Sequence, residues 1–216
     1  MTLVFFDLDD TLLAGDSEAA WAKHMLFKGI TEDSSFEEKI MKFDQDYRLG
    51  KLNFSAYTEF LLSPIKGMSV EEVHEIVRPF SVNIVDELKD SISQALLEKH
   101  SADECLITSG TLSFIVKEIA LLLGFNTFFG TEAEIKGGLY TGRVSGKPNF
   151  GEEKVRKIEN WLGDRSLIET VAYSDSINDL PLLNFSSKAV VLNPDSKLRE
   201  LAVSLGWEID DSRITI

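Results

Sequence analysis

The sequence is poor in cysteine, and its single thiol, Cys105, excludes an internal disulfide bond. Cys105 lies in the apolar segment Glu104–Thr108, where we expect a buried structural thiol rather than a catalytic one. A lone unpaired thiol is typical of a protein in a reducing compartment, so we predict a cytoplasmic location.

Long apolar runs are also lacking. No uninterrupted apolar stretch reaches the length of a membrane span, and the first residues enter a short apolar segment without the pattern of a signal peptide. Hydrophobic residues make up 44% of the chain and charged residues 27%, which is ordinary for a globular domain. We therefore expect a globular protein with no membrane partner.

Positive charge is scarce, since 22 lysine and arginine residues stand against 36 aspartate and glutamate residues, for a net charge of −14. This balance argues against nucleic acid as a partner, because a polyanion is bound by basic surfaces. The three histidines, His24, His74 and His100, have no metal-ligand spacing, so we expect structural roles for them. The Walker P-loop and the GxGxxG dinucleotide-binding fingerprint are both absent from the sequence.

Acidic residues are abundant, and three of them directly follow the first apolar run. Val4–Phe6 predicts a buried strand, which leads into Asp7, Asp9 and Asp10. Neighbouring carboxylates repel one another and are costly to bury, whereas the hard cation Mg²⁺ prefers oxygen ligands and would offset this cost. Asp7 and Asp9 point the same way in an extended chain, so one can be a nucleophile while the other transfers protons. The alternative is an acidic turn that caps a helix.

The length of 216 residues suits one core domain with an inserted subdomain. Residues 17–80 have apolar residues at helical spacing and no strand candidate, which predicts a small helical bundle inserted after the first strand. Helical and strand patterns then alternate, which predicts a parallel sheet with helices on both faces. The expected fold class is α/β, with a Rossmann-like core in residues 1–16 and 81–216 and a helical insertion in residues 17–80.

Several predicted elements bear on the site. We expect a helix near Val85–Lys99, a strand over Cys105–Thr108 and a helix opening at Ser109-Gly110. Lys136-Gly137-Gly138 predicts the turn of a hairpin. Further helices and strands are expected at Glu152–Leu162, Thr170–Tyr173, Ala189–Leu192 and Asp195–Leu205.

Three more polar clusters lie at or just beyond predicted strands, where parallel sheets bind ligands. Ser109 and Gly110 offer a hydroxyl and an amide to a phosphate oxygen, or Ser109 is only a helix cap. A lysine near a helix start, Lys147 or Lys154, belongs to the site or is a solvated surface charge. The stretch Ser174–Asp179 is a second acidic cluster of the site or a simple acidic turn.

Together these clusters resemble the motif series of haloacid dehalogenase-like (HAD) phosphatases, and the resemblance spans nearly the whole chain. Asp7-Leu8-Asp9-Asp10-Thr11 is similar to the DxDxT signature of that family. The insertion resembles a type C1 helical cap. The GKLNF stretch at residues 50–54 and the SDxxND form at residues 174–179 resemble subfamily IB, the phosphoserine phosphatase-like group.

The resemblance implies a role for each matching residue. It implies that Asp7 is the nucleophile and Asp9 the general acid and base, and that Mg²⁺ is held by Asp7, the Asp9 backbone carbonyl and Asp175. Lys154 is favoured over Lys147 as the active-site lysine, because GxxKV matches the subfamily pattern. The remaining implied roles are phosphate binding by Ser109 and the Gly110 amide, phosphate or water binding by Asn178, orientation of the lysine by Asp179, and stabilisation of the first turn by Thr11.

The resemblance implies a Mg²⁺-dependent phosphatase that acts on a small phosphorylated metabolite through an aspartyl-phosphate. Phosphoserine phosphatases carry an arginine that pairs with the substrate carboxylate, but the matching residues 55–62 contain no arginine. Asp16 occupies the position of a glutamate that faces the substrate ammonium group, unless it only caps the first inserted helix. Histidinol phosphate therefore fits better than phosphoserine. A phosphotransferase and a catalytically silent metal- or ligand-binding module stay open as alternatives.

Overall fold

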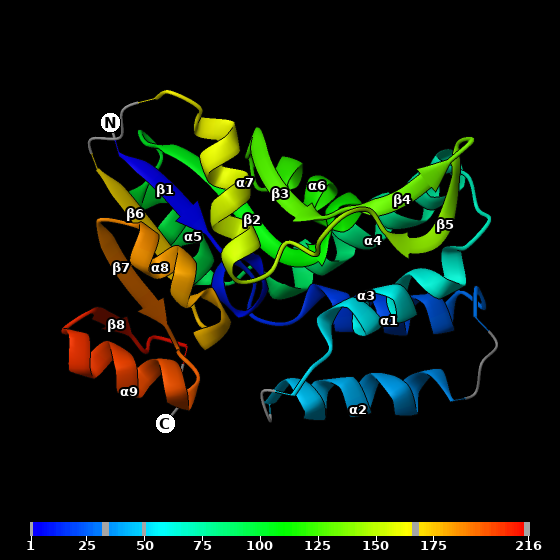
Figure 1. Cartoon of the computed structure of the whole chain (residues 1–216), viewed down its shortest axis with the longest axis horizontal. Coiled ribbons are helices and arrows are strands. Elements are labelled where there is room, and N and C mark those ends of the chain that lie inside the picture. Colours follow the sequence, from blue (N-terminus) through cyan, green and yellow to red (C-terminus); the bar gives the residue numbers. More distant parts are fainter. Residues whose placement is uncertain (1, 32–34, 49–50, 166–168, 214–216) are drawn as a thin grey trace.

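The computed structural model describes residues 2–31, 35–48, 51–165 and 169–213. Within these ranges the centre is a parallel sheet of six strands in the order β3-β2-β1-β6-β7-β8 (Figure 1). The strands are β1 (Leu3–Phe6), β2 (Glu104–Leu112), β3 (Thr127–Thr131), β6 (Thr170–Ser174), β7 (Lys188–Leu192) and β8 (Glu208–Asp210). This sheet confirms the predicted α/β, Rossmann-like fold.

Strand β1 lies inside the sheet because it is apolar on both faces. Successive side chains of a strand point to opposite faces, so Val4 and Phe6 join one buried cluster while Leu3 and Phe5 join the other. The first cluster includes side chains of α5 and α6, and the second includes side chains of α7, α8 and α9, which cover the opposite face (Figure 1). These helices are α5 (Ser91–Lys99), α6 (Ser113–Leu122), α7 (Glu152–Leu162), α8 (Leu180–Phe185) and α9 (Ser196–Leu205).

The register of the sheet brings three strands to one polar edge. Phe6, the last residue of β1, pairs with Ile107 on β2 and with Tyr173 on β6. The residues that follow these three begin the polar clusters found in the sequence. Because the strands are parallel, these clusters meet at the carboxyl edge of the sheet.

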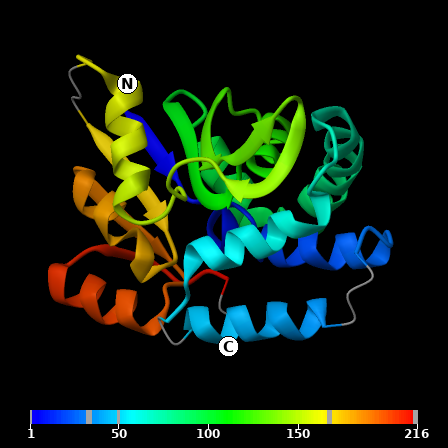
Figure 2. The ribbon, with the colours of Figure 1, turned by 45° about the vertical axis from the view of Figure 1, so that its right-hand side comes forward.

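Between β1 and β2, the described residues include four helices that correspond to the predicted insertion, before the chain reaches α5: α1 (Ser17–Phe27), α2 (Phe36–Arg48), α3 (Phe54–Leu62) and α4 (Val70–Leu88). Figure 2 shows α3 lying beyond the carboxyl edge of the sheet. The hairpin of β4 (Ala133–Lys136) and β5 (Leu139–Val144) joins these helices, since Gly67 N donates to Tyr140 O and Tyr140 N donates to Met68 O. The sequence predicted this hairpin but not its contact with the insertion. The division at residues 17–80 stays a prediction.

The helix expected near Val85–Lys99 is divided in the structure. Helix α4 continues to Leu88, and α5 begins after Asp90, whose carboxylate accepts hydrogen bonds from two of the first amides of α5. The prediction was wrong because the apolar periodicity continues across the break, while the cap is a single polar residue.

The helix expected at Ser109-Gly110 begins later than predicted. Strand β2 runs to Leu112 because its pairing with β3 resumes there after a register shift, and α6 starts at Ser113. Ser109 is therefore a strand residue, and the alternative that it is a helix cap is wrong.

Candidate active site

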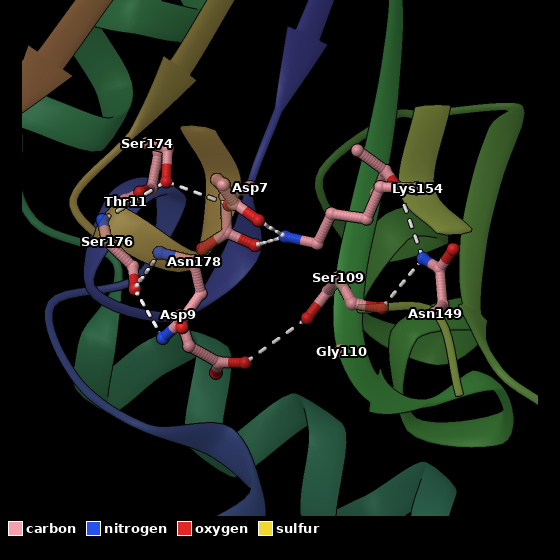
Figure 3. Close-up of polar contacts among 12 residues, drawn as sticks. Asp7, Asp9, Thr11, Ser109, Gly110, Asn149, Lys154, Ser174, Ser176 and Asn178 are labelled. Atoms are coloured by element: carbon pink, nitrogen blue, oxygen red, sulfur yellow. Dashed lines mark hydrogen bonds and ion pairs between the residues drawn. The ribbon is translucent and has the colours of Figure 1, made fainter. Parts of the chain in front are cut away.

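A buried lysine lies between two carboxylates at the polar edge. Lys154, in the first turn of α7, places Nζ 2.8 Å from the Asp7 carboxylate and 2.7 Å from the Asp179 carboxylate (Figure 3). Burial alone would lower the pKa of Lys154, but the two carboxylates outweigh burial and raise it. Lys154 is therefore held in its charged form. Lys147, the other predicted candidate, is exposed.

The carboxylates around Lys154 carry more negative charge than one lysine neutralises. Burial, together with Asp179 and Asp9, raises the pKa of Asp7 to about 7 in spite of the neighbouring lysine. Enclosure and the nearby Asp7 carboxylate raise the pKa of Asp175 well above its ordinary value. This edge of the sheet therefore favours an additional positive charge.

A bound Mg²⁺ ion fits this requirement. Asp7 and Asp175 offer hard carboxylate oxygens, and Mg²⁺ is commonly held by one or two carboxylates with waters and substrate phosphate. Thr11 Oγ1 donates to Asp175 Oδ1 at 3.3 Å, which orients that carboxylate. Over the described ranges, no three His, Cys, Asp or Glu side chains gather as a metal-binding group. The predicted set contains only two carboxylates, with the Asp9 carbonyl as its third ligand, and it stays a prediction.

Asp9 contacts hydroxyl and amide groups rather than the lysine. Its Oδ2 accepts hydrogen bonds from Thr111 Oγ1 at 2.7 Å and from Ser109 Oγ at 3.4 Å, and its Oδ1 accepts one from Ser17 N at 2.7 Å. Asp7 and Asp9 thus lie in different environments although they are two residues apart. Different environments are what two carboxylates need in order to perform different steps of one reaction.

Ser109 is buried and firmly held. Its Oγ accepts a hydrogen bond from Thr111 N at 3.1 Å, and its carbonyl accepts one from Asn149 Nδ2 at 2.9 Å. The same Asn149 amide, which Figure 3 shows beside Ser109, also donates to the Thr108 hydroxyl at 3.1 Å. Asn149 therefore holds Thr108 and Ser109 of β2 from the loop that precedes α7.

Gly110 lies against an aromatic side chain of the insertion. A Cβ atom at this position would be 2.8 Å from the ring of Phe54, the first residue of α3. The Phe54 ring stacks on Phe150 with 4.4 Å between the ring centroids. The inserted helices therefore contact the core directly beside the predicted phosphate site, and a larger residue at position 110 would force the Phe54 ring to move.

A tyrosine of the insertion reaches the loop that follows β6. The Tyr47 hydroxyl on α2 lies 2.9 Å from Ser176 Oγ, which also accepts a hydrogen bond from Asn178 Nδ2 at 3.1 Å. Enclosure of the phenol raises the pKa of Tyr47 to about 12, so the hydroxyl stays protonated at neutral pH. Asn178 is thus held from two sides, by its own loop and by α2.

Asp16 begins α1, and its Oδ1 accepts a hydrogen bond from Ala19 N at 2.9 Å. The capping role that the sequence left open is therefore present, while contact with a substrate amine stays a prediction. Two residues further on, the buried Glu18 accepts a hydrogen bond from Leu112 N at 3.1 Å. Burial, with Asp16 and Asp9 nearby, raises the pKa of Glu18 well above its ordinary value.

The predicted residues at the ends of β1, β2 and β6 come together with Lys154, whereas Lys147 does not join them. The sequence analysis missed four side chains that contact the predicted site residues or residues within three positions of them. Thr111 and Asn149 had a weak signal, as polar residues beside predicted motifs, but nothing in the local pattern distinguished the other two. The four are Glu18, Tyr47, Thr111 and Asn149.

A parallel core with an acidic carboxyl edge, a buried lysine and inserted helices beside them is the architecture expected of the family named from the sequence motifs. Residues 4–184 match the haloacid dehalogenase-like hydrolase family, and the chain belongs to this family. The predicted family is thereby confirmed.

Similar proteins narrow the class further. The chain is 35% identical over 215 residues to a histidinol-phosphatase of Neisseria meningitidis, covering 96% of this chain and 97% of that one. It is 31% identical over 219 residues to a phosphoserine phosphatase of Mycobacterium tuberculosis, covering 97% and 70%. The family match and these relatives confirm a phosphoric monoester hydrolase.

Solved structures agree on the fold. A Bordetella pertussis protein of unknown function has a TM-score of 0.88 at 31% identity, covering 98% of this chain and 99% of that one. A substrate-bound phosphoserine phosphatase has a TM-score of 0.70 at 21% identity, covering 98% and 93%. Within the described part of the chain, no helix has the length and apolar character needed to cross a membrane.

Proposed function

We propose that the protein is a Mg²⁺-dependent phosphatase that hydrolyses a small phosphomonoester through an aspartyl-phosphate on Asp7. The observation that carries this proposal is the separation of two neighbouring carboxylates. Asp7 is paired with Lys154, while Asp9 lies among the hydroxyls of Ser109 and Thr111. One environment suits a nucleophile and the other a proton-transfer group.

In the first step an Asp7 oxygen attacks phosphorus and the bond from phosphorus to the ester oxygen breaks. Asp9 gives its proton to the departing alkoxide, which leaves as an alcohol. Lys154 and the Ser109 hydroxyl stabilise the charge on the phosphoryl oxygens and hold the group in line. Mg²⁺, held by Asp7, the Asp9 carbonyl and Asp175, would supply further positive charge at the phosphoryl group.

In the second step water attacks the phosphorus of the aspartyl-phosphate. Asp9, now ionised, takes a proton from this water, and the bond from phosphorus to the Asp7 oxygen breaks to release inorganic phosphate. Asn178 orients the water or the phosphate, and its hydrogen bond to Ser176 Oγ, which Tyr47 also contacts, supports this role. Asp7 and Asp9 return to their starting protonation states.

We propose histidinol phosphate as the first substrate to test. Helix α3 contains no arginine to pair with a substrate carboxylate, which counts against phosphoserine. Asp16 offers a carboxylate near Asp9, which suits a substrate that bears an amine. The Neisseria relative that carries the name histidinol-phosphatase also matches over nearly its whole length.

The test is a phosphate-release screen over a panel of small phosphomonoesters that includes histidinol phosphate and phosphoserine. Each ester is assayed with and without Mg²⁺, beside an Asp7→Asn variant of unchanged melting temperature. We expect release that requires both Mg²⁺ and Asp7, with the highest kcat/KM for histidinol phosphate. Release from no ester by the folded wild-type protein would favour phosphotransfer to an acceptor alcohol, or a silent binding module.

A further inference from the structure

Arg213 near the C-terminus has an unusually complete set of hydrogen bonds. Its Nε and one Nη contact the two carboxylate oxygens of Asp90, at 2.7 and 3.1 Å, and the same Nη donates to Ser93 Oγ at 2.8 Å. The other Nη donates to the carbonyl of Asp10 at 3.0 Å and to that of Thr11 at 2.6 Å. These five contacts use all five N–H groups of a guanidinium.

The contacts of Arg213 join segments that are far apart in the sequence. Asp10 and Thr11 belong to the turn that directly follows Asp9, so Arg213 holds the backbone beside the predicted acid and base. Asp90 begins α5, where the chain re-enters the core after the inserted helices. In Figure 2 the C-terminal segment, in red, runs from the edge of the sheet back toward the middle of the molecule.

The turn after Asp9 needs such support. Asp10 has φ of 54°, in the left-handed region that non-glycine residues seldom adopt and that costs free energy. The carbonyls of Asp10 and Thr11 both accept from one Nη of Arg213, which holds the two peptide groups in a fixed relation. A shift of this turn would move Asp9 relative to Asp7, because Asp9 lies within the turn while Asp7 is held at the end of β1, where its amide donates to Tyr173 O.

Arg213 is itself fixed in position. Its amide donates to Asn193 Oδ1 at 3.0 Å, in the loop after β7, and only 11% of its side chain is exposed. Burial would raise the pKa of Asp90, but the hydrogen bonds from Arg213 and Ser93 outweigh burial and hold that pKa well below its usual range. The carboxylate that anchors the guanidinium therefore stays ionised.

We propose that Arg213 is a positioning residue for the phosphatase reaction, which holds the turn beside Asp9 in its active conformation. This inference rests on the proposed function for its effect on catalysis. The part of the chain that matches the family ends at residue 184, so Arg213 lies outside it. The C-terminal segment thereby contributes to the site through the backbone of this turn.

The chain offers a matched control. Arg199 donates from both Nη atoms to the Asp211 carboxylate, in the same C-terminal segment, and within the described residues no hydrogen bond joins it to the turn. Arg199→Gln therefore loosens the segment without removing a hydrogen bond from the turn. Arg213→Gln removes the ion pair with Asp90 and the hydrogen bonds to the turn. Arg213→Lys keeps the charge but lacks the planar guanidinium that reaches two segments at once.

The first measurement is amide hydrogen exchange of the segment Leu8–Gly15, which reads the turn without reference to activity. The turn contains two internal hydrogen bonds that report on it, from Asp10 N to Gly15 O and from Leu13 N to Leu8 O. We expect faster exchange in Arg213→Gln and Arg213→Lys than in wild type, and no change in Arg199→Gln. Equal exchange in all four proteins, or the same increase in Arg199→Gln, would overturn the proposal.

The second measurement is steady-state kinetics on the best ester of the screen. We expect kcat to fall roughly 10- to 100-fold in Arg213→Gln with little change in KM, because a small displacement of Asp9 affects the reacting geometry more than binding. A fall in kcat of equal size in Arg199→Gln would assign the effect to general loosening and overturn the proposal. A wild-type protein without phosphatase activity would sink the proposed function, and the exchange data would still decide whether Arg213 holds the turn.

Discussion

Replacement of Lys154 and of Lys147 in turn tests which of these two lysines belongs to the active site. We expect Lys154→Ala to lower kcat by about 100-fold or more, because its loss leaves the Asp7 and Asp179 carboxylates without their cation and removes a charge that stabilises the transition state. Lys147→Ala should stay within about twofold of wild type, because Lys147 is exposed and its charge is solvated. Steady-state kinetics on both variants checks this, and equal losses in the two variants would contradict it.

Removal of the Tyr47 hydroxyl tests whether the inserted helices affect the rate of the reaction. Tyr47→Phe keeps the ring but removes the contact to Ser176, so we expect kcat/KM to fall about 3- to 10-fold, the value of one hydrogen bond. The effect should vanish in a Ser176→Ala background, because the partner is then already gone. A double-mutant cycle on kcat/KM measures this coupling, and strictly additive losses would show that Tyr47 acts elsewhere.

Among single residues, the sequence predicted those whose position follows from the local pattern and missed those whose role depends on contacts far along the chain. Asp7 directly follows the apolar run Val4–Phe6, Asp9 comes two residues later, and Asp175 lies just beyond the predicted strand Thr170–Tyr173, so local patterns were enough to predict all three. Tyr47 and Asn149 were not found, because their roles come from contacts with Ser176 and with the end of β2, far along the sequence. Local sequence patterns cannot predict contacts between segments so far apart.

Among the elements, helix α5 depends on the charge at its first position. Asp90 accepts hydrogen bonds from two amides of α5 and pairs with Arg213, and its pKa lies well below the ordinary value because these bonds outweigh burial. A depressed carboxyl pKa in the folded state contributes stability above the unfolded value of about 3.9, and this stability is lost as pH falls. We expect Asp90→Asn to lower the free energy of unfolding at pH 7, with a gap to wild type that narrows below about pH 4.

Urea unfolding at several pH values measures this gap. The matched control is Asp211→Asn, which removes an exposed carboxylate that is also paired with an arginine, Arg199. Exposed pairs contribute little, so the control should stay close to wild type throughout. A gap for Asp90→Asn that is unchanged down to pH 3 would show that the charge of Asp90 has no part in the stability of the helix.

The sequence predicted helices and strands correctly where apolar residues recur at one regular spacing and the segment is bounded by residues that end it, such as glycine. Helix α7 was expected over Glu152–Leu162 and is found there, because its apolar spacing runs from one glycine to another. The boundary between β2 and α6 was misplaced, because the Ser109-Gly110 pair resembles a helix start while pairing with β3 extends the strand. Pairing between strands is a tertiary effect, and it overrode the local signal.

For the molecule as a whole, the net charge of −14 opposes the approach of a phosphate ester. We expect KM for a simple phosphomonoester dianion to fall by about twofold between 10 and 150 mM NaCl, because salt screens the distant carboxylates more than the groups in contact with the substrate. An ester that also bears an ammonium group should respond less. Initial rates at fixed free Mg²⁺ check this, and a KM that rises with salt for both esters would contradict it.

The central position of β1 also has a consequence for the order of events during synthesis. Leu3 pairs with Glu104 on one side and with Thr170 on the other, so the strand that leaves the ribosome early has no neighbour until much of the chain has followed. Contacts so distant in sequence are slow to form, because a long loop must close first. Asp7, the proposed nucleophile, is thus made long before the strands on either side of β1 that complete its pocket. Until β2 emerges, a nascent chain holds β1 as an unpaired apolar strand, and one edge of β1 stays open until β6 follows, so we expect the nascent chain to be prone to aggregation.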